Sequence, residues 1–383
     1  MRSISIFGAT GSVGTSTLDL VRQDRSAWGV KVLTANRNAG ALAALAREFN
    51  VQDAVVADEN CLPELRDALA GSGIAVSGGR AALCEAAAIT ADVTVAAIVG
   101  CAGLEPVMAA IEQGNTIALA NKEALVSAGE VMTAAVKNHG ATLLPVDSEH
   151  NAIFQCLQGG RTEDVRWITL TASGGPLRTW SQERLAAATP AQAVAHPNWD
   201  MGAKISVDSA TMFNKGLELI EAHHLFPVGL DKLRIVVHPQ SVIHSMVEYR
   251  DGSTLAQLGP SDMKVPIASC LAWPGRMDTP CEPLDLAGIG TLTFETPDED
   301  RFPATRLARE AALAGGAAPA VLNAANEVAV AAFLDGKIQF TQIAVVVANT
   351  LANYAPPPPA TLADVMAIDT DARARASAML ESN

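Results

Sequence analysis

The feature that most constrains the fold is a glycine-rich turn close to the N-terminus. The turn Gly8-Ala-Thr-Gly11-Ser-Val-Gly14 follows a β-branched segment at 3–7 and precedes a segment with helical spacing at 16–23. Glycines at a strand–helix junction let the backbone turn tightly and approach a pyrophosphate at the helix N-terminus. The GxxGxxG spacing is looser than the usual dinucleotide fingerprint, so an ordinary glycine turn is the alternative. The context favours dinucleotide binding.

Short β-branched segments alternate with Ala- and Leu-rich helical segments through the first 146 residues. The expected strands are 3–7, 31–33, 54–56, 93–99, 116–119 and 141–145, and the clearest helices between them are 41–49 and 107–113. This alternation predicts a parallel sheet covered by helices on both faces. The chain is 49% hydrophobic but only 4% aromatic, so its core must consist mainly of aliphatic side chains.

The end of the second expected strand indicates which dinucleotide is bound. An NAD pocket usually has an acid there to hold the ribose 2′-hydroxyl, but this strand continues into Thr34-Ala-Asn36-Arg37-Asn38, which has no acid. Arg37 is suited to a 2′-phosphate, although it could instead be a solvated loop charge. Together with the glycines, it favours NADP(H).

From Asp147 the chain becomes richer in polar loops, and strands at 167–172, 234–238 and 245–249 suggest an α+β region. Segments 304–314, 318–333 and 340–351 read as helices, followed by a polyproline spacer and a last helix. The expected fold class is α/β, with an N-terminal Rossmann-like dinucleotide-binding domain, a central α+β catalytic domain and a C-terminal α-helical bundle. The expected boundaries are 1–146 for NADPH binding, 147–275 for catalysis and metal binding with a lid loop, 276–300 for a connecting arm, and 301–383 for the helical domain.

An acidic motif, Asp147-Ser148-Glu149-His150, directly follows the strand that ends near Val146. If the segment were extended, Asp147 and Glu149 would lie on the same side and could share one cation. Oxygen ligands with few neighbouring His or Cys side chains favour Mg²⁺ or Mn²⁺ over zinc. A cluster of acids that caps the next helix is an equally good interpretation.

A second polar motif runs from Asp208 to Glu218. Ser209 is interpreted as the N-cap of a helix that continues to about residue 225. Asn214, Lys215 and Glu218 then share one face, which suits a third metal carboxylate beside two phosphate-binding groups. The alternative is a solvated helix face with one intrahelical ion pair.

Three smaller motifs complete the candidate site. Residues 171–176, with Ser173, could present a hydroxyl and backbone N–H groups to an anion, or simply form a turn. Residues 196–202 combine His196, Trp199 and Gly202 as a lid might, or form a surface loop. Asn121-Lys122-Glu123 follows an expected strand at the edge where parallel sheets bind ligands.

Charge and cysteine content exclude several classes of protein. The formal net charge of −14 disfavours binding to nucleic acid or to an anionic membrane, although local cations can still bind an anionic substrate. The six cysteines have no metal-finger spacing, which indicates reduced thiols. No signal-peptide pattern is recognised, so we expect a cytoplasmic protein.

The motifs GATGSVG, ALANKEALV, LLPVDSEHNAIFQ, TASGGP, HPNWDMG, ISVDSATMFNKGLELIEA and APAVLNAANEVAV occur in order between residue 8 and about residue 330. In this order the chain resembles the 1-deoxy-D-xylulose 5-phosphate reductoisomerases. The resemblance implies rearrangement and NADPH-dependent reduction of that sugar phosphate to 2-C-methyl-D-erythritol 4-phosphate, in non-mevalonate isoprenoid biosynthesis. It also implies a divalent cation (Mn²⁺, Mg²⁺ or Co²⁺) and a homodimer.

The resemblance assigns roles to individual residues. The implied metal ligands are Asp147, Glu149 and Glu218, which with Lys122 form the catalytic set. The implied substrate-binding residues are Lys122, Ser148, Glu149, Ser173, His196, Trp199, Ser209, Asn214, Lys215 and Glu218. The implied cofactor-binding residues are Gly8, Thr10, Gly11, Ser12, Val13, Asn36, Arg37, Asn38, Asn121, Glu123, Gly202 and Met263. An NADP-dependent dehydrogenase of another small substrate and a non-catalytic NADPH sensor are the alternatives.

Overall fold

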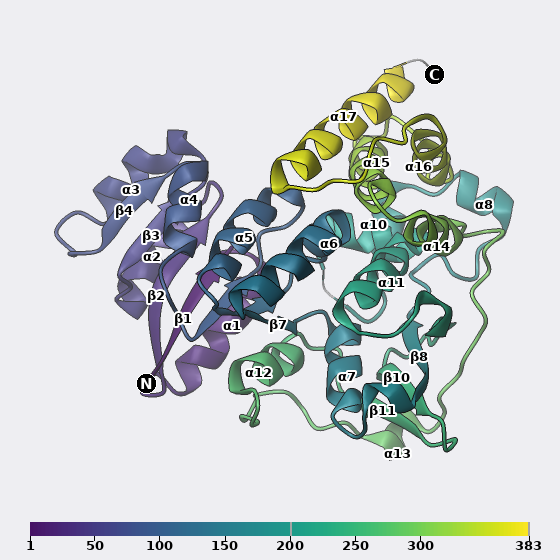
Figure 1. Cartoon of the computed structure of the whole chain (residues 1–383), viewed down its shortest axis with the longest axis horizontal. Coiled ribbons are helices and arrows are strands. Elements are labelled where there is room, and N and C mark those ends of the chain that lie inside the picture. Colours follow the sequence, from purple (N-terminus) through teal and green to yellow (C-terminus); the bar gives the residue numbers. More distant parts are fainter. Residues whose placement is uncertain (200, 382–383) are drawn as a thin grey trace. The chain divides into compact units, whose positions relative to one another are not determined.

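The computed structural model describes residues 1–199 and 201–381 (Figure 1). Asp200, in the expected lid motif, lies outside the described residues. The chain forms two compact units. The first contains Met1–Ala124, Met132–Asn151 and Met263–Cys281, and the second contains Leu125–Val131, Ala152–Asp262 and the chain from Glu282 onward.

The first unit is built on a seven-stranded parallel sheet of order β4-β3-β2-β1-β5-β6-β7. Its strands are β1 (Arg2–Phe7), β2 (Trp28–Ala35), β3 (Asp53–Val56), β4 (Ala75–Gly78), β5 (Val93–Ala96), β6 (Thr116–Leu119) and β7 (Thr142–Pro145). The expected parallel sheet is therefore confirmed, and β4 is an additional strand. The expected strand at 93–99 ends at Ala96, so residues 97–99 belong to the loop that follows it.

Helices connect these strands. They are α1 (Ser12–Gln23), α2 (Ala39–Phe49), α3 (Leu62–Ala68), α4 (Arg80–Ala87), α5 (Leu104–Glu112), α6 (Lys122–His139), the start of α7 (Ser148–Leu157), and the short 3₁₀ turns η1 (Glu59–Cys61) and η2 (Cys101–Gly103). The first helix begins at Ser12, four residues earlier than expected. Its Leu18 and Leu20 are fully buried, whereas Gly11 and Ser12 at its start are exposed.

A late segment of the chain also belongs to the first unit. The helix α12 (Lys264–Ala272) packs against α1 and contacts β6 and β7. Residues 263–275, which the sequence analysis assigned to the catalytic segment, are thus part of the compact unit that carries the parallel sheet. The domain boundaries expected from the sequence remain a prediction. The division into two compact units does not test whether each segment folds independently.

The second unit combines a four-stranded sheet with helices. The sheet order is β11-β10-β8-β9, in which β10 is antiparallel to β8 and β11, and β8 is parallel to β9. The strands are β8 (Val165–Ala172), β9 (Leu233–Val237), β10 (Ile243–Tyr249) and β11 (Thr254–Leu258), the last of which the sequence analysis missed. Beside β9, Val237 and Glu295 of the connecting arm form an antiparallel bridge.

The helices of the second unit form most of its core. They are α8 (Gln182–Ala186), α9 (Pro190–Val194), α10 (Ala203–Thr211), α11 (Phe213–Leu225), α13 (Leu286–Ile289), α14 (Ala304–Ala314), α15 (Ala318–Leu334), α16 (Gln342–Asn353) and α17 (Leu362–Glu381), with 3₁₀ turns η3 (Thr162–Asp164) and η4 (Leu230–Lys232). Phe213 and Phe333 are among the largest fully buried side chains. They pack in one cluster of mainly aliphatic residues from α10, α11, α14, α15 and α16, as the composition predicted. The expected C-terminal helices are confirmed.

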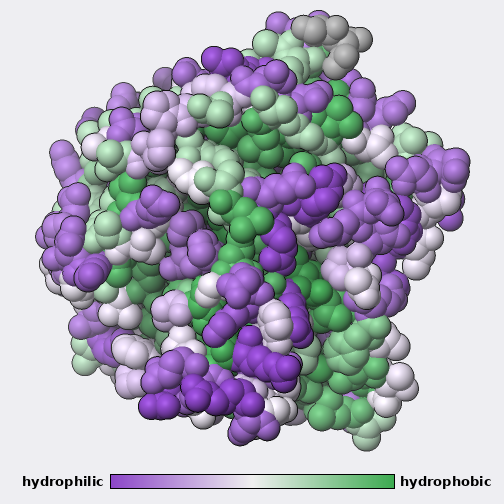
Figure 2. All heavy atoms as spheres, turned by 45° about the vertical axis from the view of Figure 1, so that its right-hand side comes forward, coloured by the Kyte–Doolittle hydropathy of each residue, from purple (hydrophilic) through white to green (hydrophobic). Residues whose placement is uncertain are grey.

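Polar and apolar side chains are interspersed on the face of the molecule shown in Figure 2. Among the described residues, no helix combines the length and apolarity that crossing a bilayer would require.

Candidate active site

The glycine turn after β1 forms a cradle that side chains would fill. Gly8 has φ +92°, and a Cβ atom placed there would lie 2.6 Å from the carbonyl oxygen of Ala97. A Cβ atom on Gly14 would lie 2.3 Å from the carbonyl oxygen of Gly8. β1 lies between β2 and β5, where the strand order reverses, and this is where open α/β sheets bind ligands. The cradle therefore fits a dinucleotide phosphate at the start of α1.

The expected cofactor residues near this turn differ in their exposure and in their hydrogen bonds. Thr10 and Val13 are partly exposed and Ser12 is exposed, all at the N-terminus of α1. Asn36, Arg37 and Asn38 are exposed at the end of β2. Asn38 also caps α2, because its side chain accepts a hydrogen bond from the backbone N–H of Ala41 (3.1 Å). Met263 lies in the same unit, immediately before α12.

Arg37 has a partner that the sequence analysis did not anticipate. Its Nε lies 2.9 Å from Oδ2 of Asp58, two residues beyond β3, while the Arg37 side chain remains 77% exposed. The pKa of Asp58 is lowered chiefly by hydrogen bonds from Asn60, and the Arg37 guanidinium lowers it further. Asp58 can thus orient the guanidinium and leave much of it accessible to an anion.

The expected group at 121–123 lies at the start of α6. The Asn121 side chain accepts a hydrogen bond from the N–H of Ala124 (3.0 Å) and donates one to the carbonyl of Gly100 (2.9 Å), so it fixes the helix start and the loop after β5. Lys122 is buried, and its Nζ lies 2.6 Å from Oδ2 of Asp147. Glu123 is also buried in the first turn.

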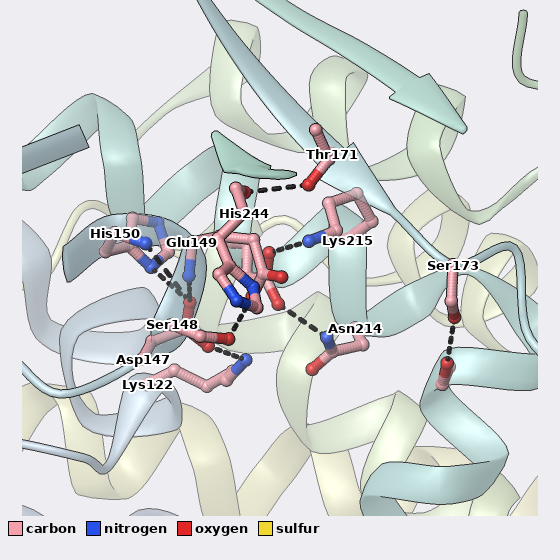
Figure 3. Close-up of polar contacts among 12 residues, drawn as sticks. Lys122, Asp147, Ser148, Glu149, His150, Thr171, Ser173, Asn214, Lys215 and His244 are labelled. Atoms are coloured by element: carbon pink, nitrogen blue, oxygen red, sulfur yellow. Dashed lines mark hydrogen bonds and ion pairs between the residues drawn. The ribbon is translucent and has the colours of Figure 1, made fainter. Parts of the chain in front are cut away.

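The Asp147 carboxylate caps the next helix, as the alternative interpretation of the acidic motif expected, and it has further charged partners. Its Oδ1 accepts hydrogen bonds from the backbone N–H groups of Glu149 (3.1 Å) and His150 (3.3 Å), so it caps α7. Its Oδ2 forms the ion pair with Lys122, and Oδ1 also lies 3.1 Å from Nδ1 of His150 (Figure 3). The fully buried His150 was missed by the sequence analysis, although its spacing of three residues from a capping acid could have indicated the contact.

The geometric reason given for pairing Asp147 with Glu149 was wrong. The segment is not extended at Glu149, because α7 begins at Ser148 and Glu149 lies in its first turn. The two side chains are nevertheless close, since ligand oxygens of Asp147 and Glu149 lie within 4.8 Å of each other. Ser148 contributes by donating a hydrogen bond to Glu149 Oε2 (2.9 Å). Two carboxylates at this spacing offer oxygen ligands that fit a hard divalent cation.

The second polar motif lies on two helices rather than one. Met212 adopts a left-handed conformation (φ 67°) and separates α10 from α11. The interpretation of Ser209 as an N-cap was therefore wrong, because Ser209 lies in the last turn of α10.

The predicted common face of α11 is confirmed. Glu218 accepts hydrogen bonds from Asn214 Nδ2 at one carboxylate oxygen and from Lys215 Nζ at the other (Figure 3). The alternative of a solvated face is excluded, because the Glu218 side chain is 0% exposed and that of Lys215 is 5% exposed. Burying a lysine and a carboxylate costs free energy unless hydrogen bonds and ion pairs satisfy both groups. Buried charges that are partnered in this way are typical of a functional site.

The loop after β8 brings two hydroxyl groups together. Gly174 and Gly175 both have positive φ, and a Cβ atom on Gly175 would lie 2.7 Å from the backbone of Ala210 and Ser209. The loop therefore packs directly on α10, with Oγ of Ser173 3.5 Å from Oγ of Ser209. The N–H of Gly175 donates to Ser173 Oγ (3.1 Å). This arrangement supports the expected anion-binding turn.

His196 of the lid segment contacts the same serine. Its Nδ1 accepts hydrogen bonds from the backbone N–H groups of Asn198 (3.2 Å) and Trp199 (3.0 Å), so the ring proton resides on Nε2. Nε2 therefore donates to Ser173 Oγ (2.8 Å). Burial lowers the pKa of His196, which favours this neutral form.

Two further residues hold the lid segment and were missed by the sequence analysis. The Asn198 side chain donates to the carbonyl of Pro239 (2.7 Å) and to Ser241 Oγ (3.2 Å). The ring of Trp199 meets that of His244 edge-on at a centroid distance of 6.1 Å, and His244 Nε2 lies 3.2 Å from the carbonyl of Gly259. Gly202 ends the lid segment as the residue before α10.

The parallel sheet with its glycine cradle, and the buried or partly buried carboxylates, lysines and serines, define a dinucleotide-binding α/β protein with groups suited to a cation and an anion. Family models agree with this class. Residues 4–129 match 1-deoxy-D-xylulose 5-phosphate reductoisomerase, residues 143–226 match the 1-deoxy-D-xylulose 5-phosphate reductoisomerase C-terminal domain, and residues 258–375 match the DXP reductoisomerase C-terminal domain.

Individual relatives extend over the whole chain. The chain is 58% identical to the 1-deoxy-D-xylulose 5-phosphate reductoisomerase of Zymomonas mobilis over 381 residues, covering 100% of this chain and 98% of the relative. It is 56% identical to that of Rhodospirillum centenum, covering 99% and 94%. The chain therefore belongs to the 1-deoxy-D-xylulose 5-phosphate reductoisomerase family.

Solved structures resemble this one closely. The Zymomonas mobilis reductoisomerase in complex with NADPH superposes with a TM-score of 0.95 at 56% identity, and 100% of both chains is covered. A DOX-P reductoisomerase in complex with NADPH, fosmidomycin and magnesium gives a TM-score of 0.94 at 43% identity, covering 100% of this chain and 98% of that one.

Proposed function

We propose that this protein converts 1-deoxy-D-xylulose 5-phosphate to 2-C-methyl-D-erythritol 4-phosphate with NADPH, as a step of non-mevalonate isoprenoid biosynthesis. The observation that carries the proposal is its 58% identity to a named reductoisomerase over the full chain. The buried Asn214–Lys215–Glu218 group supports it, because a purely structural helix would not need this combination of charges in its interior.

Most of the residues that would hold NADPH belong to the first unit. Gly8, Thr10, Gly11, Ser12 and Val13 would surround the pyrophosphate at the start of α1. Asn36, Arg37 and Asn38 would hold the adenosine end, with Arg37 on the 2′-phosphate. Asn121, Glu123, Gly202 and Met263 would contact the cofactor nearer the nicotinamide, which supplies the hydride for the reduction.

Asp147, Glu149 and Glu218 would hold a divalent cation, for which Mg²⁺, Mn²⁺ and Co²⁺ are all chemically suitable. When bound, the cation would act as a Lewis acid on the substrate carbonyl. The chain itself prepares these ligands: Lys122 and His150 fix the orientation of Asp147, Ser148 fixes Glu149, and Asn214 and Lys215 fix Glu218.

The remaining residues would bind the substrate. Ser173 and Ser209 can donate hydrogen bonds to the phosphate, with His196 at this site acting through Ser173, and Asn214 and Lys215 add an amide and a positive charge. Lys122, Ser148, Glu149 and Glu218 would face the sugar oxygens. Trp199, anchored by His244, would cover the substrate and exclude water during the reaction. We also propose that the protein acts as a homodimer in the cytoplasm.

The test is NADPH oxidation by the purified protein with 1-deoxy-D-xylulose 5-phosphate, measured with EDTA, with EDTA followed by excess Mg²⁺, and with EDTA followed by excess Mn²⁺. Turnover should vanish with the chelator and return with either ion. Full turnover in EDTA would remove the metal from the proposal. Tight NADPH binding without any turnover would favour an NADPH sensor.

A further inference from the structure

Asp208 is a buried carboxylate to which the proposed function assigns no role. Its side chain is 1% exposed. Its Oδ2 lies 2.8 Å from Nζ of Lys204, and its Oδ1 accepts a hydrogen bond from Nδ2 of Asn326 (2.8 Å). A buried carboxylate is costly unless its oxygens are well partnered, and here both are.

The three residues connect the start of α10, the part of α10 beside Ser209, and the core helix α15, all in the second unit. Lys204 lies in the first turn of α10, directly after the lid segment 196–202. Asp208 precedes Ser209, whose hydroxyl is 3.5 Å from that of Ser173. Asn326 belongs to α15, whose inner face is almost entirely buried in the core.

The first turn of α10 lacks the usual stabilising groups of a helix N-terminus. The helix has no side-chain N-cap, and its first turn contains no acid to complement the helix dipole. Within this helix, Ser206 Oγ donates to the carbonyl of Gly202 (3.0 Å), and the Lys204–Asp208 pair spans the same turn. Through Asn326, the pair adds a polar link to the apolar contacts between α10 and the core helix α15.

We propose that Asp208 is a positioning residue for the phosphate-binding site: by holding Lys204 and Asn326, it fixes the lid end of α10 and keeps Ser209 opposite Ser173. Asp208 contacts no substrate in this proposal and acts through Ser209 and the lid segment. The identity of the anion, a sugar phosphate, rests on the proposed function; the positioning role does not.

An electrostatic role and a positioning role of Asp208 predict opposite changes in phosphate binding for Asp208→Asn. The substitution removes one negative charge beside a site for a phosphate dianion, so electrostatics alone would strengthen phosphate binding. If Asp208 acts by position, the loss of the ion pair frees the first turn of α10, and phosphate binding weakens. The sign of the change therefore separates the two explanations.

The experiment compares wild type with Asp208→Asn, Lys204→Met, the double variant and Asn326→Ala. For each, we would measure kcat, KM for 1-deoxy-D-xylulose 5-phosphate, Kd for NADPH, and inhibition by inorganic phosphate. We expect KM and the phosphate inhibition constant to rise about tenfold, with kcat and the NADPH Kd changed by less than about threefold. The double variant should be no worse than either single variant, because both remove the same contact.

Glu327→Gln is the matched control. Glu327 lies next to Asn326 on α15, but its carboxylate pairs with Arg373 of α17 (2.6 Å) instead of with α10. This variant should lower the thermal stability while leaving KM and phosphate inhibition unchanged. An equal rise in KM in the control would show that general destabilisation explains the effect, and would overturn the proposal. A fall in KM, or an unchanged KM, in Asp208→Asn would also overturn it.

A second readout does not depend on the reaction. Amide hydrogen exchange of residues 203–211, measured by mass spectrometry, should be faster in Asp208→Asn and in Asn326→Ala than in wild type and Glu327→Gln. If wild type fails to turn over the sugar phosphate, the proposed function fails, but inorganic phosphate binding by calorimetry and exchange in α10 still test the positioning role. Unchanged exchange in α10 would contradict it.

Discussion

His196 donates a hydrogen bond from Nε2 to Ser173 Oγ over 2.8 Å, and the backbone of its own loop dictates this direction. Because Nδ1 accepts two backbone N–H groups, only the Nε2-protonated neutral ring fits. The serine hydroxyl can then turn its own proton toward an anion. The lid segment thus prepares a hydrogen-bond donor on a different element.

Replacing His196 should impair substrate binding through Ser173. We expect His196→Ala to lower kcat/KM about 10- to 100-fold, the effect of one or two lost hydrogen bonds in a buried site. Ser173→Ala should cost a similar amount, and the double variant should be much less impaired than the product of the two effects. Steady-state kinetics of the three variants test this. Fully multiplicative effects would show that the two side chains act independently.

Removing the partner of Asp147 should destabilise the protein. Lys122 and Asp147 have side chains only 7% and 10% exposed, so Lys122→Met removes the ammonium that pairs with a largely buried carboxylate. We expect a loss of about 3 kcal/mol in the free energy of unfolding, measured by urea titration. Lys337→Met, which removes an exposed pair with Asp335, should change this free energy by less than about 0.5 kcal/mol. Similar losses in both variants would contradict the buried role of Lys122.

The glycines of the first turn should differ in their tolerance of alanine. A Cβ atom on Gly14 would lie 2.3 Å from the backbone oxygen of Gly8, whereas one on Gly11 would come no closer than 3.4 Å to that oxygen. Gly14→Ala should therefore lower the free energy of unfolding by about 2–3 kcal/mol. Gly11→Ala should preserve the thermal midpoint and weaken NADPH binding. Equal midpoints for the two variants would show that the turn relaxes around the methyl group.

Arg37 should determine the choice between NADPH and NADH. We expect Arg37→Ala to raise KM for NADPH about tenfold or more while leaving KM for NADH nearly unchanged, because only NADPH carries the 2′-phosphate. Asp58→Asn should have a smaller effect in the same direction, since it removes only the group that orients the guanidinium. Kinetics with both cofactors provide the measurement. An unchanged preference in Arg37→Ala would assign the 2′-phosphate to other residues.

His224 should make stability fall in weak acid. Burial, with a contribution from neighbouring His223, lowers the pKa of His224 to about 4. The folded state therefore resists protonation that the unfolded chain accepts below about pH 6.5, so stability is retained above that pH and lost as pH falls toward 4. Between pH 7.5 and 5.0, this group alone should cost about 2 kcal/mol.

Urea titrations of wild type and His224→Gln at several pH values test this prediction. The variant should be less stable near neutrality, because its side chain must replace a ring packed against Gly129, but its stability should fall less steeply with acid. Parallel pH profiles for the two proteins would assign the acid sensitivity to other groups.

Much of the first unit could be predicted because its signals are local. The glycine turn, the buried run at 93–96 and the alternation of strands and helices each depend on short-range patterns. The strand Ala75–Gly78 escaped prediction because it is short and ends in serine and glycine, which have little strand preference. The strand Thr254–Leu258 is mostly exposed, and its sequence TLAQL does not alternate regularly between apolar and polar residues.

The residue types of the candidate site could be predicted from the sequence, but the contacts between these residues were harder to predict. Residues spaced along one helix, such as Asn214 and Glu218, meet because helical periodicity brings them together. The break at Met212 has no such signal, since a non-glycine residue with positive φ is held there by tertiary packing. Asn198 could not be identified either, because its partners lie about forty residues away on another loop.

The bridge between Glu295 and Val237 has a consequence for the behaviour of the protein at high concentration. Two backbone hydrogen bonds, of 2.9 and 2.8 Å, occupy donor and acceptor groups on the outer side of β9. An unprotected strand there would be a template for a foreign strand, and hence a starting point for aggregation. The connecting arm thus covers the outer edge of β9, and shortening it should reduce solubility before it reduces catalytic activity.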